Sequence, residues 1–520
     1  MPPSSMSFEA LTPTAFLRRS ACVFPDKTAV IDGEKRWTYA ELHQRCLRLA
    51  GALRNAGVQP GARVAVLAPN THVLLEAHYG VPYAGAVLVA LNVRLTAADH
   101  GYIIEHCDAG VLIYDAEFED TARAIAAEAK HPLKLLRGGD GDDNPYEKFL
   151  ADAAPYSEPV IDERSLLSIN YTSGTTGKPK GVMYHHRGAY LQALAMAMHG
   201  ALNESSVFLW TLPMFHCNGW CFTWAVTAAG GTHLCLRKAD PALMWNHLRG
   251  SGVTQFNAAP TILIMLAWHE TAQPLARVVN VATGGAPPTP ALLARMAELN
   301  MNMTHLYGLT ETYGPAVICE WRRDWNQWPA AQQAQIKARQ GVGNVAAESL
   351  RVVDAQGADV PKDGATLGEI ALRGNNVMLG YYRDDAATAK AAPDGWFRTG
   401  DLAVMHADNY IEIKDRAKDI IISGGENIAS VEVERTLSSH AAVLEAAVVA
   451  APDEKWGEVP VAFVTLKPGQ SLDAPALIAY AREHMAHFKA PQKVVFGDLP
   501  KNATGKIQKF ILREAAKKLL

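Results

Sequence analysis

The sequence predicts an α/β fold: a large N-terminal domain of parallel-sheet α/β subdomains plus a small β-rich part, followed by a small, mobile α/β C-terminal domain. Short apolar runs alternate with amphipathic helical stretches up to about residue 310, which is typical of parallel sheets with crossover helices. After residue 341 the pattern changes to shorter strands and tight turns. The 520 residues, 49% hydrophobic and 20% charged, allow about two to four well-packed domains.

The expected elements follow one another in a regular rhythm. Thr38 and Glu41 form a capping box that begins a helix, and Gly57 ends it. Buried strands are expected at residues 64–68, 86–91, 111–114, 207–212, 232–236, 253–257, 278–282 and 302–307. Several of these strands end in loops of small or polar residues. Because ligands of open α/β sheets bind at the carboxyl ends of strands, these loops predict one cleft.

The stretch Tyr171–Gly181 predicts a polyphosphate-binding loop. Its glycines let the backbone curl around an anion, while its hydroxyl groups and the lysines Lys178 and Lys180 add donors and charge. The phosphate loop of kinases and GTPases does not fit, because Thr172 replaces its first glycine and Pro179 its magnesium-binding hydroxyl. A plain linker is the other alternative, but it does not explain the two lysines or the apolar strand before them.

The charged segment Asp415–Asp419 predicts a hinge, with a solvated turn as the alternative. About a hundred residues of compact α/β sequence follow it, which is enough for a domain. The expected domains are residues 1–416 and 417–520, with the hinge near Lys418. The second domain ends in the glycine loop Asn502–Lys506 and a basic helix.

Composition excludes several classes of function. The net charge of −4 gives no reason to expect nucleic-acid binding. The N-terminus has no basic start or apolar run, so no secretory signal is predicted, and the apolar region Val81–Leu91 is too short to span a membrane. Seven scattered cysteines predict reduced, packed thiols in a cytoplasmic protein. A zinc site at His216, Cys217 and Cys221 is disfavoured, because no second His/Cys pair accompanies it.

Five motifs, in order, resemble those of the adenylate-forming family of acyl-CoA synthetases, luciferases and peptide-synthetase adenylation domains. They are Tyr171–Gly181, Tyr307–Glu311, Gly395–Asp401 after Tyr381 and Tyr382, Asp415–Arg416, and Pro500–Lys506. The likeness extends from about Phe16 to Lys509. Within the family, Pro213–Trp220 is most similar to the acyl-CoA ligase branch for short or medium chains, which includes methylmercaptopropionate-type ligases.

The resemblance implies that the chain uses ATP to convert a carboxylic acid to acyl-AMP and pyrophosphate, and then transfers the acyl group to CoA. ATP, Mg²⁺ and CoA are the implied cofactors and co-substrates. A small carboxylic acid is the implied partner, with no nucleic acid and no membrane span, and a homo-oligomer is left open.

The same motifs leave other functions open. These are an enzyme that loads a carrier protein, an aryl-CoA ligase, a luciferase-type monooxygenase and, from another class, a non-catalytic nucleotide-binding regulator. The lack of an appended carrier-like segment favours free CoA. The presence of both Glu311 and Lys506 argues against the regulator.

The resemblance also assigns the nucleotide site. The β- and γ-phosphates would be held by Thr172, Ser173, Gly174, Thr175, Thr176, Gly177, Lys178 and Lys180. Adenine would lie against Gly284, Gly285, Ala286, Pro287, Tyr307 and Gly308, and the ribose against Asp401 and Arg416. Thr310 would contact the α-phosphate, and Glu311, with Thr172, would bind Mg²⁺, which prefers hard oxygen ligands.

Two residues are expected to drive the chemistry and its switch between half-reactions. The ammonium of Lys506 would bridge the attacking carboxylate and the α-phosphate during adenylation. Rotation about Lys418 would then remove Lys506 and open a thiol tunnel near Ser423, Gly424 and Gly425.

The acyl group would lie near His216, Trp220, Gly284 and Gly308. His216 is placed beside the acyl carboxylate, and a packed core histidine is the alternative. Relatives restricted to acetate carry tryptophan where Gly308 stands. The glycine is therefore expected to leave open space and to admit acids longer than acetate.

Overall fold

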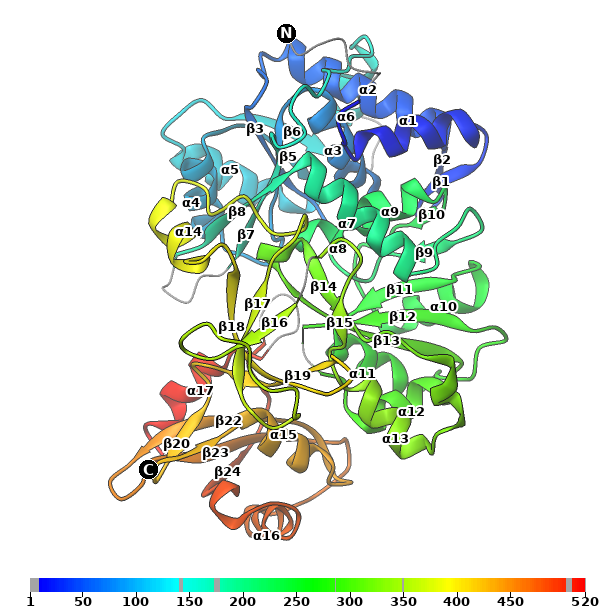
Figure 1. Cartoon of the computed structure of the whole chain (residues 1–520). Helices are drawn as coiled ribbons and strands as arrows, with labels where there is room; N and C mark the ends of the chain where they lie inside the picture. Colours follow the sequence, from blue (N-terminus) through cyan, green and yellow to red (C-terminus); the bar gives the residue numbers. More distant parts are fainter. Residues whose placement is uncertain are drawn as a thin grey trace.

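The computed structural model describes residues 9–139, 144–172, 178–285, 287–347, 350–501 and 507–519. It confirms the α/β class: two mainly parallel sheets with helices around them are followed by an antiparallel sheet and by a C-terminal sheet with its own helices (Figure 1). No helix within these ranges combines the length and the apolar character that crossing a bilayer requires.

The first sheet contains six strands in the order β6-β5-β3-β4-β7-β8. All neighbours are parallel except β7 and β8, which form an antiparallel hairpin. The predicted capping box begins α2: Glu41 N donates to Thr38 Oγ1 at 3.2 Å, and Thr38 N donates to Glu41 Oε2 at 2.8 Å. The strands are β3 (Arg63–Leu67), β4 (Val87–Ala90), β5 (Ala109–Asp115), β6 (Lys134–Gly138), β7 (Leu166–Thr172) and β8 (Lys180–His185). The helices of this region are α1 (Thr14–Val23), α2 (Tyr39–Asn55), α3 (His72–Tyr83), α4 (Ala97–Cys107), α5 (Glu119–Glu128), α6 (Pro145–Ala151) and α7 (His186–His199).

The second sheet contains nine strands in the order β15-β14-β13-β12-β11-β9-β10-β1-β2. Its central strands are parallel, while β2, β14 and β15 run antiparallel at the edges. The strands are β1 (Thr28–Asp32), β2 (Lys35–Thr38), β9 (Val207–Leu209), β10 (Thr232–Leu234), β11 (Gln255–Ala258), β12 (Val279–Thr283), β13 (Met301–Leu309), β14 (Gly314–Ile318) and β15 (Val342–Gly343). The helices are α8 (Cys217–Trp220), α9 (Phe222–Ala228), α10 (Pro241–Gly250), α11 (Pro260–Ala267), α12 (Pro290–Glu298) and α13 (Ala330–Lys337).

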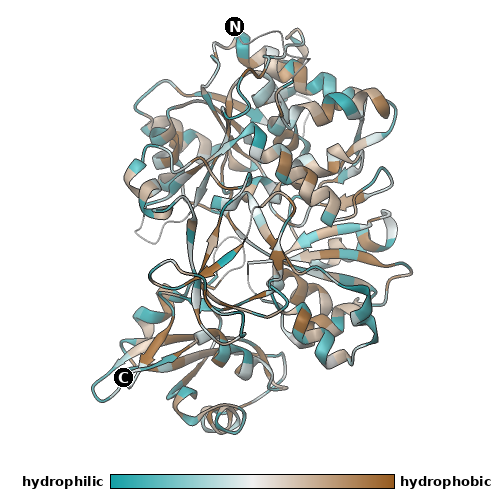
Figure 2. Ribbon diagram, viewed as in Figure 1, coloured by the Kyte–Doolittle hydropathy of each residue, from teal (hydrophilic) through white to brown (hydrophobic). Residues whose placement is uncertain are grey.

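A four-stranded antiparallel sheet links this body to the C-terminal part, which lies at the lower end of Figure 1. The linking region comprises β16 (Arg351–Val353), β17 (Gly368–Leu372), α14 (Asp385–Ala391), β18 (Phe397–Met405) and β19 (Ile411–Arg416). The C-terminal part comprises β20 (Ile421–Ser423), β21 (Glu426–Ile428), α15 (Ser430–Ser438), β22 (Val443–Asp453), β23 (Gly457–Leu466), α16 (Ala474–His484), β24 (Lys493–Phe496) and α17 (Lys509–Ala516). Two hydrophobic clusters lie wholly within residues 421–519, and the apolar colour of Figure 2 runs along these strands. The C-terminal part therefore has its own core.

A buried charge cluster, hereafter the Arg45 cluster, joins the first helices. Arg45 Nε pairs with Glu76 Oε1 at 2.5 Å, and its terminal nitrogens donate to both oxygens of Glu147 at 2.7 Å. His72 Nδ1 hydrogen-bonds Asp32 Oδ2 at 2.6 Å, and its Nε2 lies 3.7 Å from Glu147 Oε1. The Glu76 side chain is fully buried. Buried charges need partners of this kind, because each ion has lost its hydration.

Candidate active site

The hairpin β7–β8 carries the predicted phosphate loop. Thr172 lies opposite Lys180 in the hairpin register, so a strand pair holds both ends of the loop. The Tyr171 hydroxyl is 2.7 Å from His106 Nδ1, which ties the hairpin to α4. The residues at the tip, Ser173, Gly174, Thr175, Thr176 and Gly177, lie outside the described residues.

The two lysines of this loop lie over aromatic rings. Lys178 Nζ is 5.4 Å from the centre of the Tyr102 ring, and Lys180 Nζ is 4.7 Å from the centre of the Tyr381 ring. The nearest carboxylate to Lys180 is that of Asp384, at 3.8 Å, which is longer than a hydrogen bond. A ring face attracts a cation without neutralising it, so both charges stay available to an anion.

A segment that we call the strap, residues 378–384, lies along β8. Leu379 N donates to Met183 O at 3.0 Å, Met183 N to Gly380 O at 3.0 Å, and Tyr382 N to Gly181 O at 2.7 Å. These backbone bonds, with an isolated antiparallel bridge between Tyr381 and Val182, hold the strap along β8. Tyr381 and Tyr382 belong to one of the motifs noted above, but no sequence pattern predicts this contact.

The strap also reaches the Tyr307–Glu311 motif. Glu311 lies in a short 3₁₀ turn, η2 (Thr310–Thr312), directly after β13. Met378 N donates to the Glu311 carbonyl at 2.8 Å, and the Tyr381 hydroxyl donates to Glu311 Oε1 at 2.8 Å. The phosphate hairpin and the predicted metal ligand, far apart in the sequence, are therefore joined through one segment.

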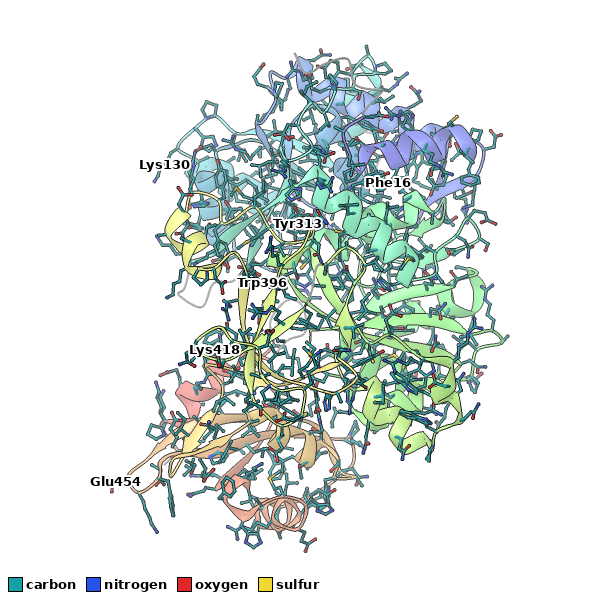
Figure 3. The ribbon with its side chains drawn as sticks, viewed as in Figure 1. Phe16, Lys130, Tyr313, Trp396, Lys418 and Glu454 are labelled. Atoms are coloured by element: carbon teal, nitrogen blue, oxygen red, sulfur yellow. The ribbon has the colours of Figure 1, made fainter. Side chains whose placement is uncertain are left out.

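Two tyrosines fix η2 against β8. The Tyr184 hydroxyl donates to the Thr310 carbonyl at 2.5 Å. Tyr313, near the centre of Figure 3, stacks on Tyr184 with the ring centroids 3.8 Å apart. The Tyr313 hydroxyl accepts a hydrogen bond from His185 N at 2.7 Å. Both rings are fully buried, so the position of Thr310 and Glu311 is set by packed aromatic surface.

His216 and Thr310 come together as predicted. Both are half-buried and both line a cavity of about 40 Å³ at the ends of β4 and β7. The thiol of Cys217 lies between them, 3.6 Å from Thr310 Oγ1 and 3.9 Å from the His216 ring nitrogens. The other lining residues are Ala90, Leu91, Asn92, Leu95, Ile103, Asn170, Tyr171 and Phe215. His216 is therefore part of a cavity wall, which argues against a packed core histidine.

The neighbouring cysteine does not support a zinc site. Burial raises the pKa of the Cys217 thiol to about 12, so in the absence of a metal the thiol is protonated at neutral pH. The described residues contain no group of three or more His, Cys, Asp and Glu side chains that could hold a metal.

A strained turn separates His216 from Trp220. The residues 217–221 all have positive φ, from 45° to 63°, although only Gly219 and Asn218 are residue types common in that region. Left-handed backbone costs roughly 1–2 kcal/mol for each residue with a Cβ atom, and such strain is found mainly at functional sites. Sequence reasoning missed this turn, because neither cysteine nor tryptophan signals a left-handed conformation.

The side chain of Asn218 holds this turn in place. Its Nδ2 group is 3.0 Å from His78 Nε2, and its Oδ1 accepts from Ser168 Oγ at 2.8 Å and from Asn170 Nδ2 at 2.6 Å. Burial lowers the pKa of His78 to about 4, so the imidazole is neutral and its Nε2 can accept. The buried amide thus compensates for the backbone strain.

The two residues predicted to contact the ribose, Asp401 and Arg416, are joined to Tyr307, which was predicted to pack on adenine. The Tyr307 hydroxyl donates to Asp401 Oδ2 at 2.7 Å, and Arg416 Nε lies 3.2 Å from Asp401 Oδ1. Asp401 and Arg416 are direct partners in the β18–β19 register. Burial, together with the Asp401 carboxylate, raises the pKa of Tyr307 well above its usual value, so Tyr307 remains a hydrogen-bond donor.

One residue of the predicted adenine wall lies beside Trp220. A Cβ atom at Gly284 would lie 3.2 Å from the Trp220 ring, so these two residues are neighbours as expected. Gly285, with φ +89°, faces open space, and Pro287 is half-buried. Ala286 lies outside the described residues.

The expected open space at Gly308 is absent. A Cβ atom there would lie 1.8 Å from the Gly314 carbonyl oxygen on the neighbouring strand β14. The register shifts between Tyr307 and Gly308, which turns this position toward backbone. Tryptophan cannot replace Gly308 without moving a strand. The glycine is therefore explained by close strand approach, and the expectation of open space beside it was wrong. The link between Gly308 and acid length stays a prediction.

The hinge residue and the predicted thiol-tunnel residues lie in different places. Lys418 lies in an exposed turn between β19 and β20, at the junction marked in Figure 3. Gly424 N donates to Trp456 O at 2.8 Å, which packs the Ser423–Gly425 turn beside the outer tip that Glu454 marks in Figure 3. The structure does not bring this turn to the Tyr307–Asp401 group. Lys506 lies outside the described residues.

The donor atoms near η2 suit a hard divalent cation. Glu311 offers a carboxylate, one oxygen of which is already held by Tyr381, and Thr172 offers a hydroxyl at the end of the phosphate hairpin. A site with one protein carboxylate fits Mg²⁺, which usually keeps water and phosphate oxygens as its other ligands.

Comparison with known proteins identifies the family. The AMP-binding enzyme family matches residues 17–382, and the C-terminal domain of AMP-binding enzymes matches residues 432–506. An acetate–CoA ligase of Humulus lupulus is 45% identical over 550 residues, with 100% of this chain and 97% of that protein covered. A peroxisomal acetate/butyrate–CoA ligase of Arabidopsis thaliana is 44% identical over 551 residues, with 100% and 97% covered.

A solved structure extends the likeness to the whole fold. ATP-bound MatB from Rhodopseudomonas palustris matches with a TM-score of 0.87 and 27% sequence identity, covering 98% of this chain and 100% of that one. The two family matches lie in the order that the motifs predict. The chain is therefore a member of the AMP-binding enzyme family and belongs to its acyl-CoA synthetase branch.

Proposed function

We propose that this chain is an ATP-dependent, AMP-forming acyl-CoA synthetase for short-chain carboxylic acids. The observation that supports this most directly is the convergence of the phosphate hairpin, Thr310 and Glu311 through the strap. Acetate and butyrate, which the relatives' names give as their substrates, support a short acid. Because Gly308 faces the backbone of β14, we do not take it as a measure of the space for the acyl chain, and the shortest acid accepted is to be found by assay.

The first half-reaction is the attack of the acid's carboxylate oxygen on the α-phosphorus of ATP. The bond from that phosphorus to the bridging oxygen breaks, and pyrophosphate leaves. Both reactants are anionic, so the protein must neutralise charge and align the atoms. We assign Lys178 and Lys180 to the β- and γ-phosphates, Thr310 to the α-phosphate and Lys506 to the developing charge. Mg²⁺ held by Glu311, with Thr172, would supply further charge neutralisation.

The second half-reaction is the attack of the CoA sulfur on the acyl carbon. The bond from that carbon to the AMP oxygen breaks, AMP leaves, and the thiol proton passes to solvent. We assign His216 and Trp220 to the acyl end of the cleft, and Tyr307, Asp401 and Arg416 to the nucleoside. In this role the charged pair Asp401–Arg416 presents carboxylate oxygens to the ribose hydroxyls.

We further propose that the chain divides into residues 1–416 and 417–520 and that it rotates near Lys418 between the half-reactions. Among the contacts that cross this junction, Glu412 pairs with Arg435 at 3.2 Å, and Asp415 accepts a hydrogen bond from Ser430 N. Both must break if the C-terminal part turns to bring Ser423, Gly424 and Gly425 to the thiol path. Lys418→Pro, which fixes φ, should retain one half-reaction and abolish the overall one. Thioester formation at the full rate would exclude this hinge.

The test of the function is pyrophosphate release across linear, branched, thioether and aromatic acids, with and without CoA. We expect acid-dependent release for short aliphatic acids, acyl-AMP without CoA, and acyl-CoA with AMP when CoA is added. Lys506→Ala should lose acyl-AMP formation but still convert supplied acyl-AMP and CoA to thioester. Pyrophosphate release that no acid stimulates would refute the proposal.

We also propose a cytoplasmic location. All seven cysteines are unpaired thiols and all but Cys22 are buried, which suits a reducing compartment. The Arabidopsis relative is peroxisomal, so imaging of the tagged chain should compare these two compartments.

A further inference from the structure

Tyr381 contacts three parts of the candidate site, although the sequence analysis gave it no role. Its hydroxyl donates to Glu311 Oε1 at 2.8 Å. Its ring carries the Lys180 ammonium at 4.7 Å from the centroid. Its backbone forms an antiparallel bridge with Val182 of β8. One side chain thus touches both the predicted metal ligand and a predicted phosphate cation.

The backbone contacts and the hydroxyl contact are separable. Tyr381 N donates to Thr388 Oγ1 at 2.9 Å, and the bridge to Val182 uses main-chain atoms alone. A phenylalanine at this position keeps those bonds and keeps a ring face for Lys180. Only the hydrogen bond to Glu311 would be lost.

That hydrogen bond has a consequence for Glu311. A half-buried glutamate has several rotamers, and each must be given up when the carboxylate binds a ligand. The Tyr381 hydroxyl holds Glu311 Oε1 before any cation binds. The other carboxylate oxygen, Oε2, is therefore kept in a defined direction. A neutral donor does this without cancelling the carboxylate charge, whereas a lysine or arginine in its place would compete with a cation.

We propose that Tyr381 is a positioning residue, which holds the Glu311 carboxylate ready for the divalent cation of the metal–ATP complex. This inference rests on the proposed function only in taking Glu311 as a metal ligand. It adds a residue of the strap to the site and gives that segment a role beyond covering β8.

The test compares purified full-length wild type and Tyr381→Phe in two assays. The first is binding of Mn²⁺, followed by electron paramagnetic resonance, with an ATP analogue whose α,β-bridge cannot be cleaved. We expect the Mn²⁺ dissociation constant to rise about tenfold, as for loss of one hydrogen bond to a charged group. The second is the Mg²⁺ concentration for half-maximal pyrophosphate release, which should rise by a similar factor, while the rate at saturating Mg²⁺ stays within about threefold.

Two further variants separate positioning from a structural effect. Tyr382→Phe removes the neighbouring hydroxyl, on a ring that packs edge-on against His106, and should leave Mn²⁺ binding unchanged. In a Glu311→Gln background, Tyr381→Phe should cause no additional loss of Mn²⁺ affinity, because the two residues act through one contact. An additional tenfold loss in that background would overturn the proposal.

An unchanged Mn²⁺ dissociation constant in Tyr381→Phe would also overturn it, whatever happens to the rate. The binding assay needs neither acid nor CoA. A failure of the proposed acyl-CoA synthetase activity would therefore appear in the pyrophosphate assay of the wild type and would not be confused with a failure of this inference.

Discussion

The Arg45 cluster and the active-site cleft both collect charged side chains from distant parts of the chain, but they treat those charges differently. In the Arg45 cluster each charge meets an opposite charge: Arg45 meets two carboxylates, and His72 meets Asp32. In the cleft, Glu311 meets a tyrosine hydroxyl and Lys180 an aromatic ring. Charges that are neutralised inside the protein stabilise the fold, whereas charges held by neutral groups remain able to bind a charged substrate.

The strongest test of this contrast removes the charge of Glu311. Glu311→Gln keeps the shape and should lower acid-dependent pyrophosphate release about 10²- to 10³-fold, because a metal and phosphate site loses its carboxylate. The midpoint of urea-induced unfolding should stay where it is in wild type. A marked shift of that midpoint with little loss of rate would place Glu311 with the structural charges instead.

The same isosteric change in the Arg45 cluster should have the opposite outcome. Glu76→Gln leaves Arg45 with only Glu147 and should lower the free energy of unfolding by about 3 kcal/mol, since a buried charge loses a partner. The activity per folded molecule should not change. Urea titration and active-site-normalised rates measure the two quantities, and an unchanged midpoint would contradict the assignment.

The Arg45 cluster should also make stability depend on pH. Burial alone would lower the pKa of His72, but its hydrogen bond to Asp32 and the nearby Glu147 carboxylate outweigh burial and raise the pKa to about 9. Because the pKa of His72 is higher in the folded chain than in the unfolded chain, protonated His72 stabilises the fold. This stabilisation is complete below pH 6.5, the pKa in the unfolded chain, and is lost as the pH rises from 6.5 through 9. Its size is at most about 3 kcal/mol.

Urea unfolding of wild type and His72→Asn at the two ends of this range measures that contribution. Wild type should lose more stability than the variant on going to the higher pH. Equal losses in the two proteins would show that His72 is not the titrating group.

The smallest effect is expected from Asp384, the only carboxylate that approaches Lys180 within 4 Å among the described residues. Asp384→Asn keeps the N-cap of α14, where Asp384 Oδ1 accepts from Ala387 N, and removes the charge. A half-exposed pair at 3.8 Å contributes at most about 1 kcal/mol, so the KM for ATP should change less than about twofold. A tenfold change would mean that Lys180 is neutralised by Asp384 after all.

Local patterns in the sequence predicted the fold well. The alternation of strands and helices, the capping box at Thr38, and a compact C-terminal α/β region are all found where they were expected. These features depend on residues close in sequence, such as apolar periodicity and caps, which can be seen without the structure. The short β8 strand and the β1–β2 hairpin were not predicted, because edge pairing leaves a weaker pattern.

The parts of the site that sequence reasoning missed depend on long-range contacts. The strap contacts β8 through backbone bonds, which carry no residue signal. The direction of Gly308 depends on a register shift that a strand pattern cannot show. One signal was available: His78 stands in a largely apolar helix, where a buried polar group needs a partner, and one such partner is Asn218.

In the acyl site that we propose, the left-handed turn at residues 217–221 limits how acid preference can diverge. Bulky or branched replacements there add to existing strain, and a side chain at Gly219 would meet the Trp210 ring at 2.7 Å. Most substitutions in the turn are therefore expected to destabilise the fold, so they are lost before they can alter which acid is preferred. If the proposed acyl site is correct, changes of acid preference are expected in the surrounding wall, where Leu91, Leu95 and Phe215 line the same cavity with ordinary backbone.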